Sequence, residues 1–316
     1  MRTNGKGKKR VAIIGYGSQG RAWALNLRDS GLAVTVGLRV RSKSRKLAAQ
    51  DGFRELATIP SAVQAAGIIV MAFPDHLHGS VFRKEIAPFL SHGSTLVFLH
   101  GTSVHFGYVK PPQDSDIIMI APHAPGSAVR EKYLGDRSIS AFYAVVQNAS
   151  GHATHTAFAL ASALRIDRRR LMRTTFADES VGDLFGEQAV LCGGLSQLIR
   201  TGYDLLVEEG IHPEHAYLEV AYQLDLIIAL IKQHGIQGML QRISVAARYG
   251  SVMAGPKIIN ASVKASMRRT LDDITSGRFA RRLNRLDKNS MAKLSRDVMK
   301  MSGPSFEKAA RKLGRR

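Results

Sequence analysis

The sequence contains one cysteine, few aromatic residues and no long apolar run. Cys192 is the only cysteine in 316 residues, which excludes an internal disulfide framework and favours a reducing compartment. Apolar runs all fall short of the roughly 20 residues that a membrane-spanning helix needs. The apolar stretch after the basic residues 1–10 continues into a glycine-rich turn instead of a signal-peptide cleavage site. We therefore expect a cytoplasmic protein without a membrane partner.

Acidic residues are also scarce relative to basic ones. The chain has 45 Lys and Arg residues against 25 Asp and Glu residues, for a formal net charge of +20. Much of the excess lies in residues 1–10 and 278–316. Such a charge attracts nucleic acid or anionic metabolites. Because no nucleic-acid-binding motif and no interleaved aromatic residues accompany it, we interpret it as a solvated surface and do not expect a nucleic-acid partner.

The strongest motif near the amino terminus is a dinucleotide-binding fingerprint, VAIIGYGSQG, at residues 11–20. A short apolar strand leads into Gly15, Gly17 and Gly20, and a helix follows at 21–29. The first glycine permits a tight turn, the second lets a pyrophosphate approach the backbone, and the third lets the helix pack on the strand. A tight turn without a ligand is the simpler alternative, but the helix N-terminus behind this turn suits a phosphate.

The end of the next expected strand indicates which cofactor binds. NAD-preferring folds usually carry an acidic residue there for the ribose 2′-hydroxyl, but this chain has Arg39, followed by Arg41, Ser42, Lys43 and Ser44. Guanidinium and hydroxyl groups suit a 2′-phosphate. The pattern predicts NADPH over NADH, with a solvated basic loop as the alternative.

Alternating apolar and amphipathic segments predict a Rossmann-like, doubly wound parallel sheet in an α/β domain at residues 1–174. The expected strands are 11–14, 33–38, 67–73, 94–99, 116–121 and 139–146. In such sheets ligands bind at the carboxyl ends of the strands. Asp75, His100, His123 and Gly126 follow strand ends and are therefore candidates for the site.

A second, all-helical domain is expected at residues 175–316, because the strand pattern stops near Thr174. Helical periodicity covers 181–209, 213–234, 236–250 and 262–286. Gly210, Gly235 and the pair Gly255-Pro256 are the expected breaks between these helices.

Three carboxylates stand out in the apolar helical segments. Asp183 and Glu187 are four residues apart on one helix face, and Glu219 lies in a second apolar segment. Like charges at this spacing repel unless a cation lies between them, and oxygen ligands suit Mg²⁺. Ordinary surface or helix N-terminal charges explain these residues equally well on this pattern alone.

Together these segments resemble the ketol-acid reductoisomerases of branched-chain amino-acid synthesis. The resemblance rests on matching segments in family order, the most specific being DLFGEQAVLCGG at 183–194; the others are VAIIGYGSQGRAWALNLRDSG, VTVGLR, FPD, EIAPFL, LVFLHGTSVHFG, IIMIAPHAPG, TTF and RISVAARYG. It implies a short-chain member of the family whose helical domain is knotted and which forms a homodimer or a higher homo-oligomer with shared active sites.

The resemblance also implies roles for individual residues. NADPH would be held by nine positions: Gly15, Gly17, Ser18, Gln19, Arg39, Ser42, Ser44, Asp75 and Gly126. Mg²⁺ would be bound by Asp183, Glu187 and Glu219, the last from the partner subunit. His100 matches the family's active-site histidine, and Glu187 and His123 are further catalytic candidates; Ser244 and Gln223 would contact substrate. The implied reaction is a Mg²⁺-assisted alkyl migration in a 2-acetolactate, followed by NADPH reduction of the 2-keto acid.

Three positions depart from the family pattern. Gln223 stands where the family has a glutamate, and an amide carries no charge and cannot act as a base. His123 stands where the family has a lysine, and Arg248 replaces an acid in RISVAARYG. These changes leave two alternatives to the full reaction: an NADPH-dependent reductase of 2-keto acids or imines that has lost the isomerisation, and a non-catalytic protein that binds NADPH or anions.

Overall fold

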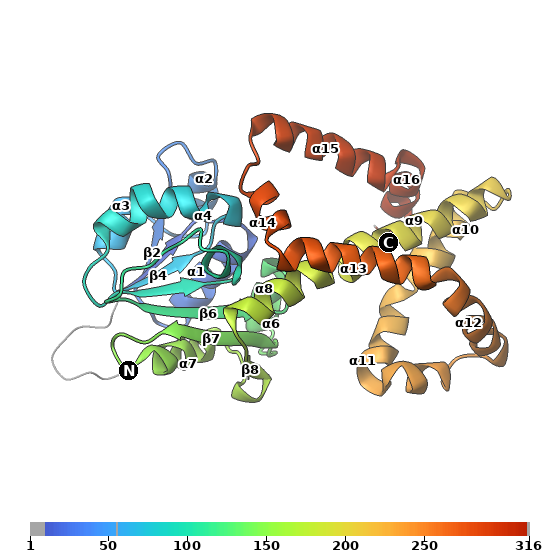
Figure 1. The fold of residues 1–316 in the computed structure, drawn as a ribbon, viewed down its shortest axis with the longest axis horizontal. Helices are drawn as coiled ribbons and strands as arrows, with labels where there is room; N and C mark the ends of the chain where they lie inside the picture. The colour runs from blue at the N-terminus through green and yellow to red at the C-terminus, as the bar shows by residue number, and fades with distance from the viewer. Residues whose placement is uncertain (1–9, 55, 315–316) are drawn as a thin grey trace. The chain divides into compact units, whose positions relative to one another are not determined.

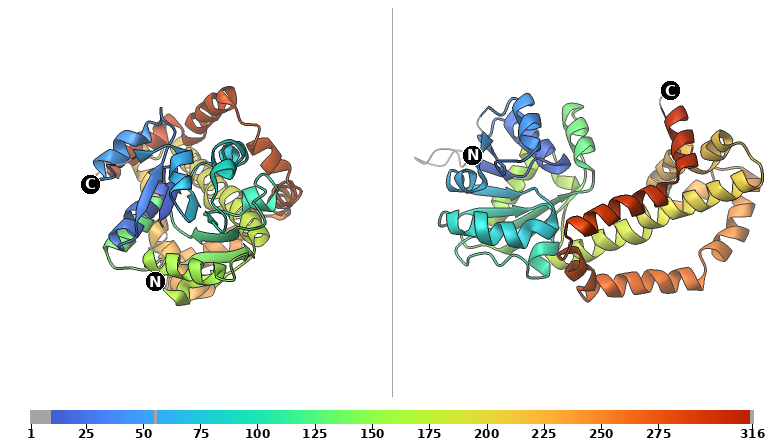
Figure 2. Two further views of the ribbon diagram at one scale, coloured as in Figure 1. Left: turned by 90° about the vertical axis from the view of Figure 1, so that its left-hand side faces the viewer. Right: turned by 90° about the horizontal axis from the view of Figure 1, so that it is seen from above.

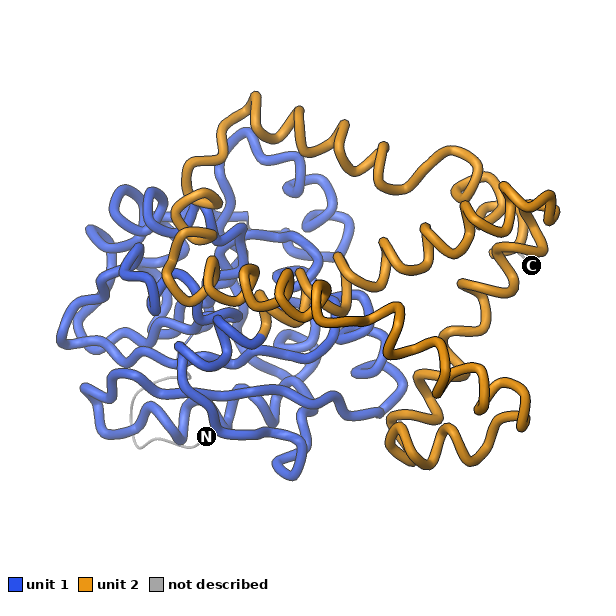
Figure 3. Tube along the Cα trace, turned by 45° about the vertical axis from the view of Figure 1, so that its right-hand side comes forward, with its two compact units in different colours: residues 1–182 blue, residues 183–316 orange. Residues whose placement is uncertain are grey.

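The computed structural model describes residues 10–54 and 56–314, which form two compact units (Figure 3). Unit 1 extends to Gly182 and unit 2 begins at Asp183. Helix α8, Phe176–Phe185, starts in the first unit and its last residues are counted with the second. Each unit is described separately below.

Unit 1 is built on an eight-stranded sheet in the order β3-β2-β1-β4-β5-β6-β7-β8 (Figure 1). The strands are β1 Val11–Ile14, β2 Val34–Gly37, β3 Leu56–Ala57, β4 Ile68–Met71, β5 Thr95–Phe98, β6 Asp116–Pro122, β7 Ala141–Gln147 and β8 Leu171–Arg173. The six predicted strands are present, and the short strands β3 and β8 at the sheet edges were not predicted. The Rossmann-like fold class is confirmed.

One strand departs from the predicted parallel sheet. β7 pairs antiparallel with β6, so that Pro122 lies opposite Ala141, whereas the other neighbouring strands are parallel. The chain between them contains α6, but it returns to the end of the sheet that it left, so β7 runs in the opposite direction. An antiparallel strand in an otherwise parallel sheet is common in α/β folds.

Helices cover both faces of this sheet (Figures 1 and 2). They are α1 Ser18–Asp29, α2 Ser44–Gln50, α3 Ile59–Gln64, α4 Asp75–Val81, α5 Thr102–His105, α6 Gly126–Leu134 and α7 Ala153–Ala163. In β1, Val11 and Ile13 join the core under α1 and α7, whereas Ala12 and Ile14 join the core under α3. The alternation follows from the two-residue period of a strand, and burial on both faces explains why its sequence is continuously apolar.

Unit 2 is helical throughout the part that the structure describes, as predicted. Its helices are α9 Gly193–Glu208, α10 Pro213–Tyr217, α11 Leu224–Leu240, α12 Val245–Ile258, α13 Ala261–Thr275, α14 Arg278–Leu283, α15 Lys288–Ser302 and α16 Pro304–Leu313. Tyr203, Ala216 and Ala309 form its buried core. Every described helix of the chain is too short or too polar to cross a membrane.

The helix boundaries in unit 2 differ from the prediction in several places, and the helix predicted over 262–286 is divided into α13 and α14. A helix was expected over 236–250, but α11 continues to Leu240 and α12 starts only after Ser244, whose side chain accepts a hydrogen bond from the Ala247 N–H. A serine at this position is a favourable N-cap. The break expected at Gly235 is present, with a φ of +69°, whereas Gly255-Pro256 lies inside α12.

Candidate functional site

The glycine-rich loop joins β1 to α1 and is held by contacts between backbone atoms. Gly15 has a φ of +98°, and a Cβ there would lie 2.4 Å from the Ala72 carbonyl oxygen. A Cβ on Gly20 would lie 2.7 Å from the Gly15 carbonyl oxygen. No described atom lies within 4 Å of the place that a Cβ on Gly17 would take. Open space at the middle glycine is what the approach of a pyrophosphate to the backbone requires.

The N-terminus of α1 is the second part of this cradle. No side chain caps it, so its first N–H groups are available to an anion. Gly126 packs directly against it, because a Cβ there would lie 2.1 Å from the Ser18 carbonyl oxygen. Gln19 donates its amide to the Ala124 carbonyl at 2.8 Å, and its buried Oε1 has no hydrogen-bond partner among the described residues. A buried acceptor such as Gln19 Oε1 could accept a hydrogen bond from a donor group of a bound dinucleotide.

The loop after β2 carries the residues expected at a 2′-phosphate. Arg39, Arg41 and Lys43 are exposed, and Ser42 and Ser44 are half-buried. The Ser42 hydroxyl accepts from the Ser44 N–H at 3.3 Å, and this turn leads into α2. The predicted cations and hydroxyls therefore lie on one short loop, and Arg45 supports it by donating to the Leu56 carbonyl at 2.8 Å.

Three histidine and carboxylate groups gather where β4 and β5 end. Asp75 begins α4, and its carboxylate lies 3.6 Å from Nδ1 of His78 and 3.9 Å from Nδ1 of His100. His78 is buried; its Nε2 contacts the Phe73 carbonyl at 2.8 Å and its Nδ1 contacts the Ser103 hydroxyl at 2.9 Å. Because a carbonyl can only accept, Nε2 bears the proton, and the hydroxyl donates to Nδ1. Through these two hydrogen bonds His78 connects the segment just before Asp75 with the turn just after His100.

Burial lowers the pKa of His78 below its ordinary value of 6.5. The unfolded chain therefore binds a proton before the folded chain does, and acidification through this range costs stability. We expect the parent to lose more stability than His78→Gln between about pH 7 and pH 5. The melting temperatures of both proteins, measured across that range, test this; an identical pH dependence would contradict it.

Glu179 on α8 is a site residue that the sequence analysis missed. Its side chain is 3% exposed, and its Oε2 accepts the Gly101 N–H at 2.6 Å and lies 3.9 Å from Nε2 of His100. The next residue, Ser180, bonds to Thr102 at 2.8 Å. Gly101 permits this approach, because a Cβ there would lie 2.3 Å from the Phe176 carbonyl oxygen. The only sequence signal was an acidic residue beside Ser180 in an apolar helix.

A candidate metal-binding group includes one of the predicted ligands. Ligand atoms of His100, Glu179 and Asp183 lie within 4.8 Å of one another, with Glu179 and Asp183 one turn apart on α8. Two carboxylates suit Mg²⁺, which prefers oxygen, while imidazole is a softer ligand. In the described part of the chain this group does not include Glu187 or Glu219. Both of these are exposed and lie in π-helical segments, Gly186–Leu191 and Leu218–Tyr222.

The three other predicted residues also have defined places. Gln223 is exposed and donates its amide to the Glu219 carboxylate at 3.2 Å. Ser244 is the exposed N-cap of α12. His123 follows β6, where its Nδ1 lies 3.1 Å from the Ser140 hydroxyl and its ring packs edge-on against Phe142.

Two family models match the chain along nearly its whole length. Residues 6–169 match "Acetohydroxy acid isomeroreductase, NADPH-binding domain", and residues 176–315 match "Ketol-acid reductoisomerase, C-terminal domain". The chain belongs to the ketol-acid reductoisomerase family. The NADP(+)-dependent ketol-acid reductoisomerase of Pyrobaculum aerophilum is 48% identical over 86% of this chain and 83% of its own length.

One solved structure supports this assignment, and a second shares only the fold. An NADH-preferring ketol-acid reductoisomerase from an uncultured archean matches with a TM-score of 0.91 and 36% identity, over 97% of this chain and 94% of its own. A semialdehyde dehydrogenase NAD-binding protein from Cupriavidus necator is 21% identical over 83% of this chain and 99% of its own, with a TM-score of 0.65, and shares the fold alone.

Family membership confirms several predictions from the sequence. The chain is an oxidoreductase of the NADPH-dependent reductoisomerase family, whose members serve branched-chain amino-acid synthesis and require Mg²⁺. The predicted preference for NADPH agrees with the NADPH-binding family model and with the Pyrobaculum relative. The roles of individual site residues stay predictions.

Proposed function

We propose that this chain catalyses both steps of the family reaction on 2-acetolactate-like acids, within valine and isoleucine synthesis. These steps are an alkyl migration and the reduction of the resulting 2-keto acid. The observation that carries the proposal is the convergence of His100, Glu179 and Asp183 within 4.8 Å, in a chain whose glycine-rich loop keeps open space at Gly17.

The proposed binding residues are those that the sequence singled out, with Glu179 added. NADPH would contact Gly15, Gly17, Ser18, Gln19, Arg39, Ser42, Ser44, Asp75 and Gly126. Mg²⁺ would be held by Asp183, Glu187 and the partner's Glu219, with Glu179 beside Asp183 in the candidate metal-binding group. Substrate would contact Ser244 and Gln223. When bound, NADPH supplies a hydride and Mg²⁺ polarises substrate oxygens as a Lewis acid.

His100 is the proposed proton-transfer group, and the residues around it would hold its imidazole in position. A carboxylate oxygen lies 3.9 Å from each of its ring nitrogens, from Asp75 on one side and Glu179 on the other. These charges orient the imidazole and attract a proton on either nitrogen. The Gly101 N–H fixes Glu179, so that His100 can hold or deliver a proton to a substrate oxygen. His123 and Glu187 are the other proposed catalytic residues.

The second candidate is a reductase that has lost the isomerisation. Gln223 favours it, because its amide donates to a Glu219 oxygen at 3.2 Å and leaves one negative charge fewer near the proposed Mg²⁺ site. NADPH oxidation with 2-acetolactate and with a 2-keto acid, each with and without Mg²⁺, distinguishes the two. The full reaction requires Mg²⁺-dependent turnover of 2-acetolactate; turnover of the keto acid alone would favour the reductase.

The glutamine also gives a testable prediction about metal affinity. We expect Gln223→Glu to lower the Mg²⁺ concentration needed for half-maximal 2-acetolactate turnover by about tenfold, because a carboxylate beside Glu219 adds a negative charge next to a proposed ligand. Reduction of the 2-keto acid serves as the internal control and should change little. An unchanged Mg²⁺ requirement would show that position 223 lies outside the metal site.

Three coarser features complete the proposal. Domain limits of 1–174 and 175–316 are close to the ranges that the two family models match. A homodimer with shared sites agrees with the exposed apolar side chains of unit 2, including Leu226, Val252 and Ile258.

The single cysteine supports a cytoplasmic location, and the knot in the helical domain stays a prediction.

A further inference from the structure

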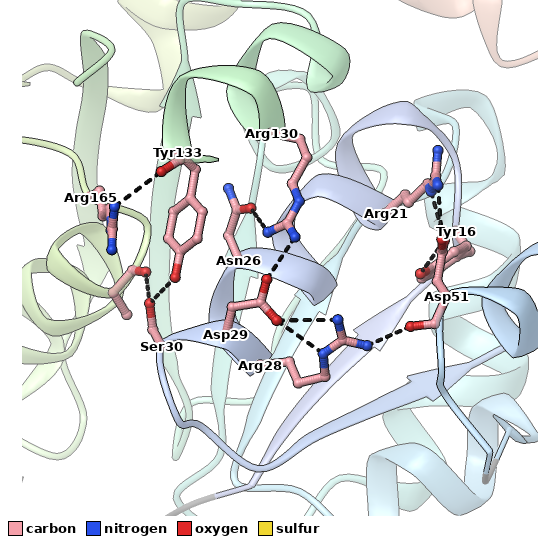
Figure 4. Close-up of polar contacts among 11 residues, drawn as sticks. Tyr16, Arg21, Asn26, Arg28, Asp29, Ser30, Asp51, Arg130, Tyr133 and Arg165 are labelled. Carbon is pink, nitrogen blue, oxygen red and sulfur yellow. Dashed lines mark hydrogen bonds and ion pairs between the residues drawn. The ribbon is translucent and has the colours of Figure 1, made fainter. Parts of the chain in front are cut away.

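Asp51 is a charged residue outside the predicted site that contacts the glycine-rich loop directly (Figure 4). Its Oδ2 accepts a hydrogen bond from the Tyr16 hydroxyl at 3.0 Å. The Arg21 guanidinium donates to both of its carboxylate oxygens, at 2.6 and 2.8 Å. One side chain therefore binds the residue between Gly15 and Gly17 and also the first turns of α1.

Asp51 also belongs to the element that follows the proposed 2′-phosphate loop. It caps the C-terminus of α2, the helix that begins at Ser44. Its carbonyl oxygen accepts from Arg28 at 2.5 Å, and the Arg28 guanidinium lies 5.0 Å from the centre of the Phe53 ring. Asp51 thus links the glycine-rich loop to the far end of the helix that follows the proposed 2′-phosphate loop.

The hydrogen bond between Tyr16 and Asp51 is largely shielded from solvent. Tyr16 is 4% exposed, its ring packs edge-on against Phe53, and the Asp51 side chain is 14% exposed. Hydrogen bonds from Arg21 hold the pKa of Asp51 below its usual range, while burial and the bond to Asp51 raise the pKa of Tyr16. The pair is therefore a neutral phenol that donates to a carboxylate at neutral pH.

We propose that Asp51 is a positioning residue for NADPH. Its hydrogen bond holds Tyr16 in place, and Tyr16 in turn fixes the backbone of the glycine-rich loop that binds the cofactor. Asp51 does not touch the cofactor itself. The inference rests on the proposed function, because it assigns a specific support to the loop that binds the pyrophosphate. Backbone N–H groups bind phosphate well only when they are fixed in place before binding.

The chain provides a matched control at the other end of α1. Asp29 is also an aspartate that accepts from two arginines, Arg28 at 3.1 Å and Arg130 at 2.6 Å, although it is more exposed than Asp51 (Figure 4). Although burial opposes it, these hydrogen bonds lower the pKa of Asp29 as well. In the described part of the chain Asp29 ends α1 and bonds to Arg28 and Arg130, not to the glycine-rich loop, so its loss should affect stability more than NADPH binding.

The test is the affinity for NADPH of the full-length chain, read from NADPH fluorescence in the absence of substrate, for the parent, Asp51→Asn, Tyr16→Phe and Asp29→Asn. We expect the dissociation constant to rise about tenfold in Asp51→Asn and severalfold in Tyr16→Phe, and to stay within about twofold in Asp29→Asn. In turnover, the KM for NADPH should rise in the first two variants, while kcat at saturating NADPH and the KM for 2-acetolactate stay near the parent values.

The outcomes separate the inference from the proposed function. Unchanged NADPH affinity in Asp51→Asn, or in Tyr16→Phe, which keeps the ring and removes only the hydroxyl, would overturn the inference alone. An equal loss in Asp29→Asn would also overturn it, because the effect would then be a general loss of stability. A parent chain that does not bind NADPH would overturn the proposed function, and the inference with it.

Discussion

Gly17→Ala should reduce NADPH affinity by about a hundredfold or more, the equivalent of roughly 2.7 kcal/mol, without destabilising the free protein. The reason is that the added methyl group would enter space that is open to a ligand, since no described atom lies within 4 Å of it. The backbone there, with φ of −79° and ψ of −165°, is accessible to alanine. Alanine is a poorer N-cap than glycine, but it also restricts the unfolded chain, so the net change in stability should stay within about 1 kcal/mol.

Gly20→Ala is the matched comparison within the same loop. Its Cβ would lie 2.7 Å from the Gly15 carbonyl oxygen, so it should destabilise the free protein by about 1–3 kcal/mol. Thermal unfolding without cofactor and titration with NADPH measure the two effects separately. Full NADPH affinity in Gly17→Ala would mean that the cofactor does not approach this glycine.

Glu179→Gln should lower kcat by about a hundredfold or more while leaving NADPH affinity nearly unchanged. Glutamine keeps an oxygen that can accept the Gly101 N–H, so the turn after β5 should persist. It removes the negative charge that lies 3.9 Å from His100 and that would help Asp183 to hold a divalent cation. The loss should therefore appear in catalysis and in the Mg²⁺ requirement.

Asp178→Asn is the control for this prediction. Asp178 is the neighbouring residue on α8, but it is exposed and bonds to Thr175 at the start of the helix. The same chemical change should leave turnover within about twofold, as is usual for exposed positions. Steady-state kinetics at saturating NADPH and 2-acetolactate compare the two variants. Equal kcat values would mean that Glu179 serves the fold and not the reaction.

Local patterns in the sequence were sufficient to predict six of the strands and the glycine-rich turn between β1 and α1. The apolar run at 11–14 and the glycines after it determine a strand, a turn and a helix within a few residues, and the structure shows all three. The change from strand to helix periodicity near Thr174 likewise agrees with the helical unit 2. These features depend on neighbours in sequence, so a single sequence contains enough information to predict them.

Features that depend on contacts between distant segments could not be predicted in the same way. Glu179 becomes part of the site only because Gly101, 78 residues away, approaches its carboxylate. The direction of β7 depends on where the chain returns to the sheet, which periodicity does not encode. The i, i+4 spacing of Asp183 and Glu187 assumed a regular helix, but Glu187 lies in a π-helical segment. Such segments occur often at functional sites, and Glu219 lies in another.

The measurement that tests the account most directly is the identity of the product formed from 2-acetolactate, NADPH and Mg²⁺. Alkyl migration followed by reduction of the keto group yields a branched 2,3-dihydroxy acid, and the account predicts this product in equal amount to the NADPH consumed, with none formed when Mg²⁺ is removed by a chelator. Unrearranged 2-acetolactate in the presence of Mg²⁺, together with steady reduction of an added 2-keto acid, would contradict it and identify a reductase that no longer isomerises its substrate.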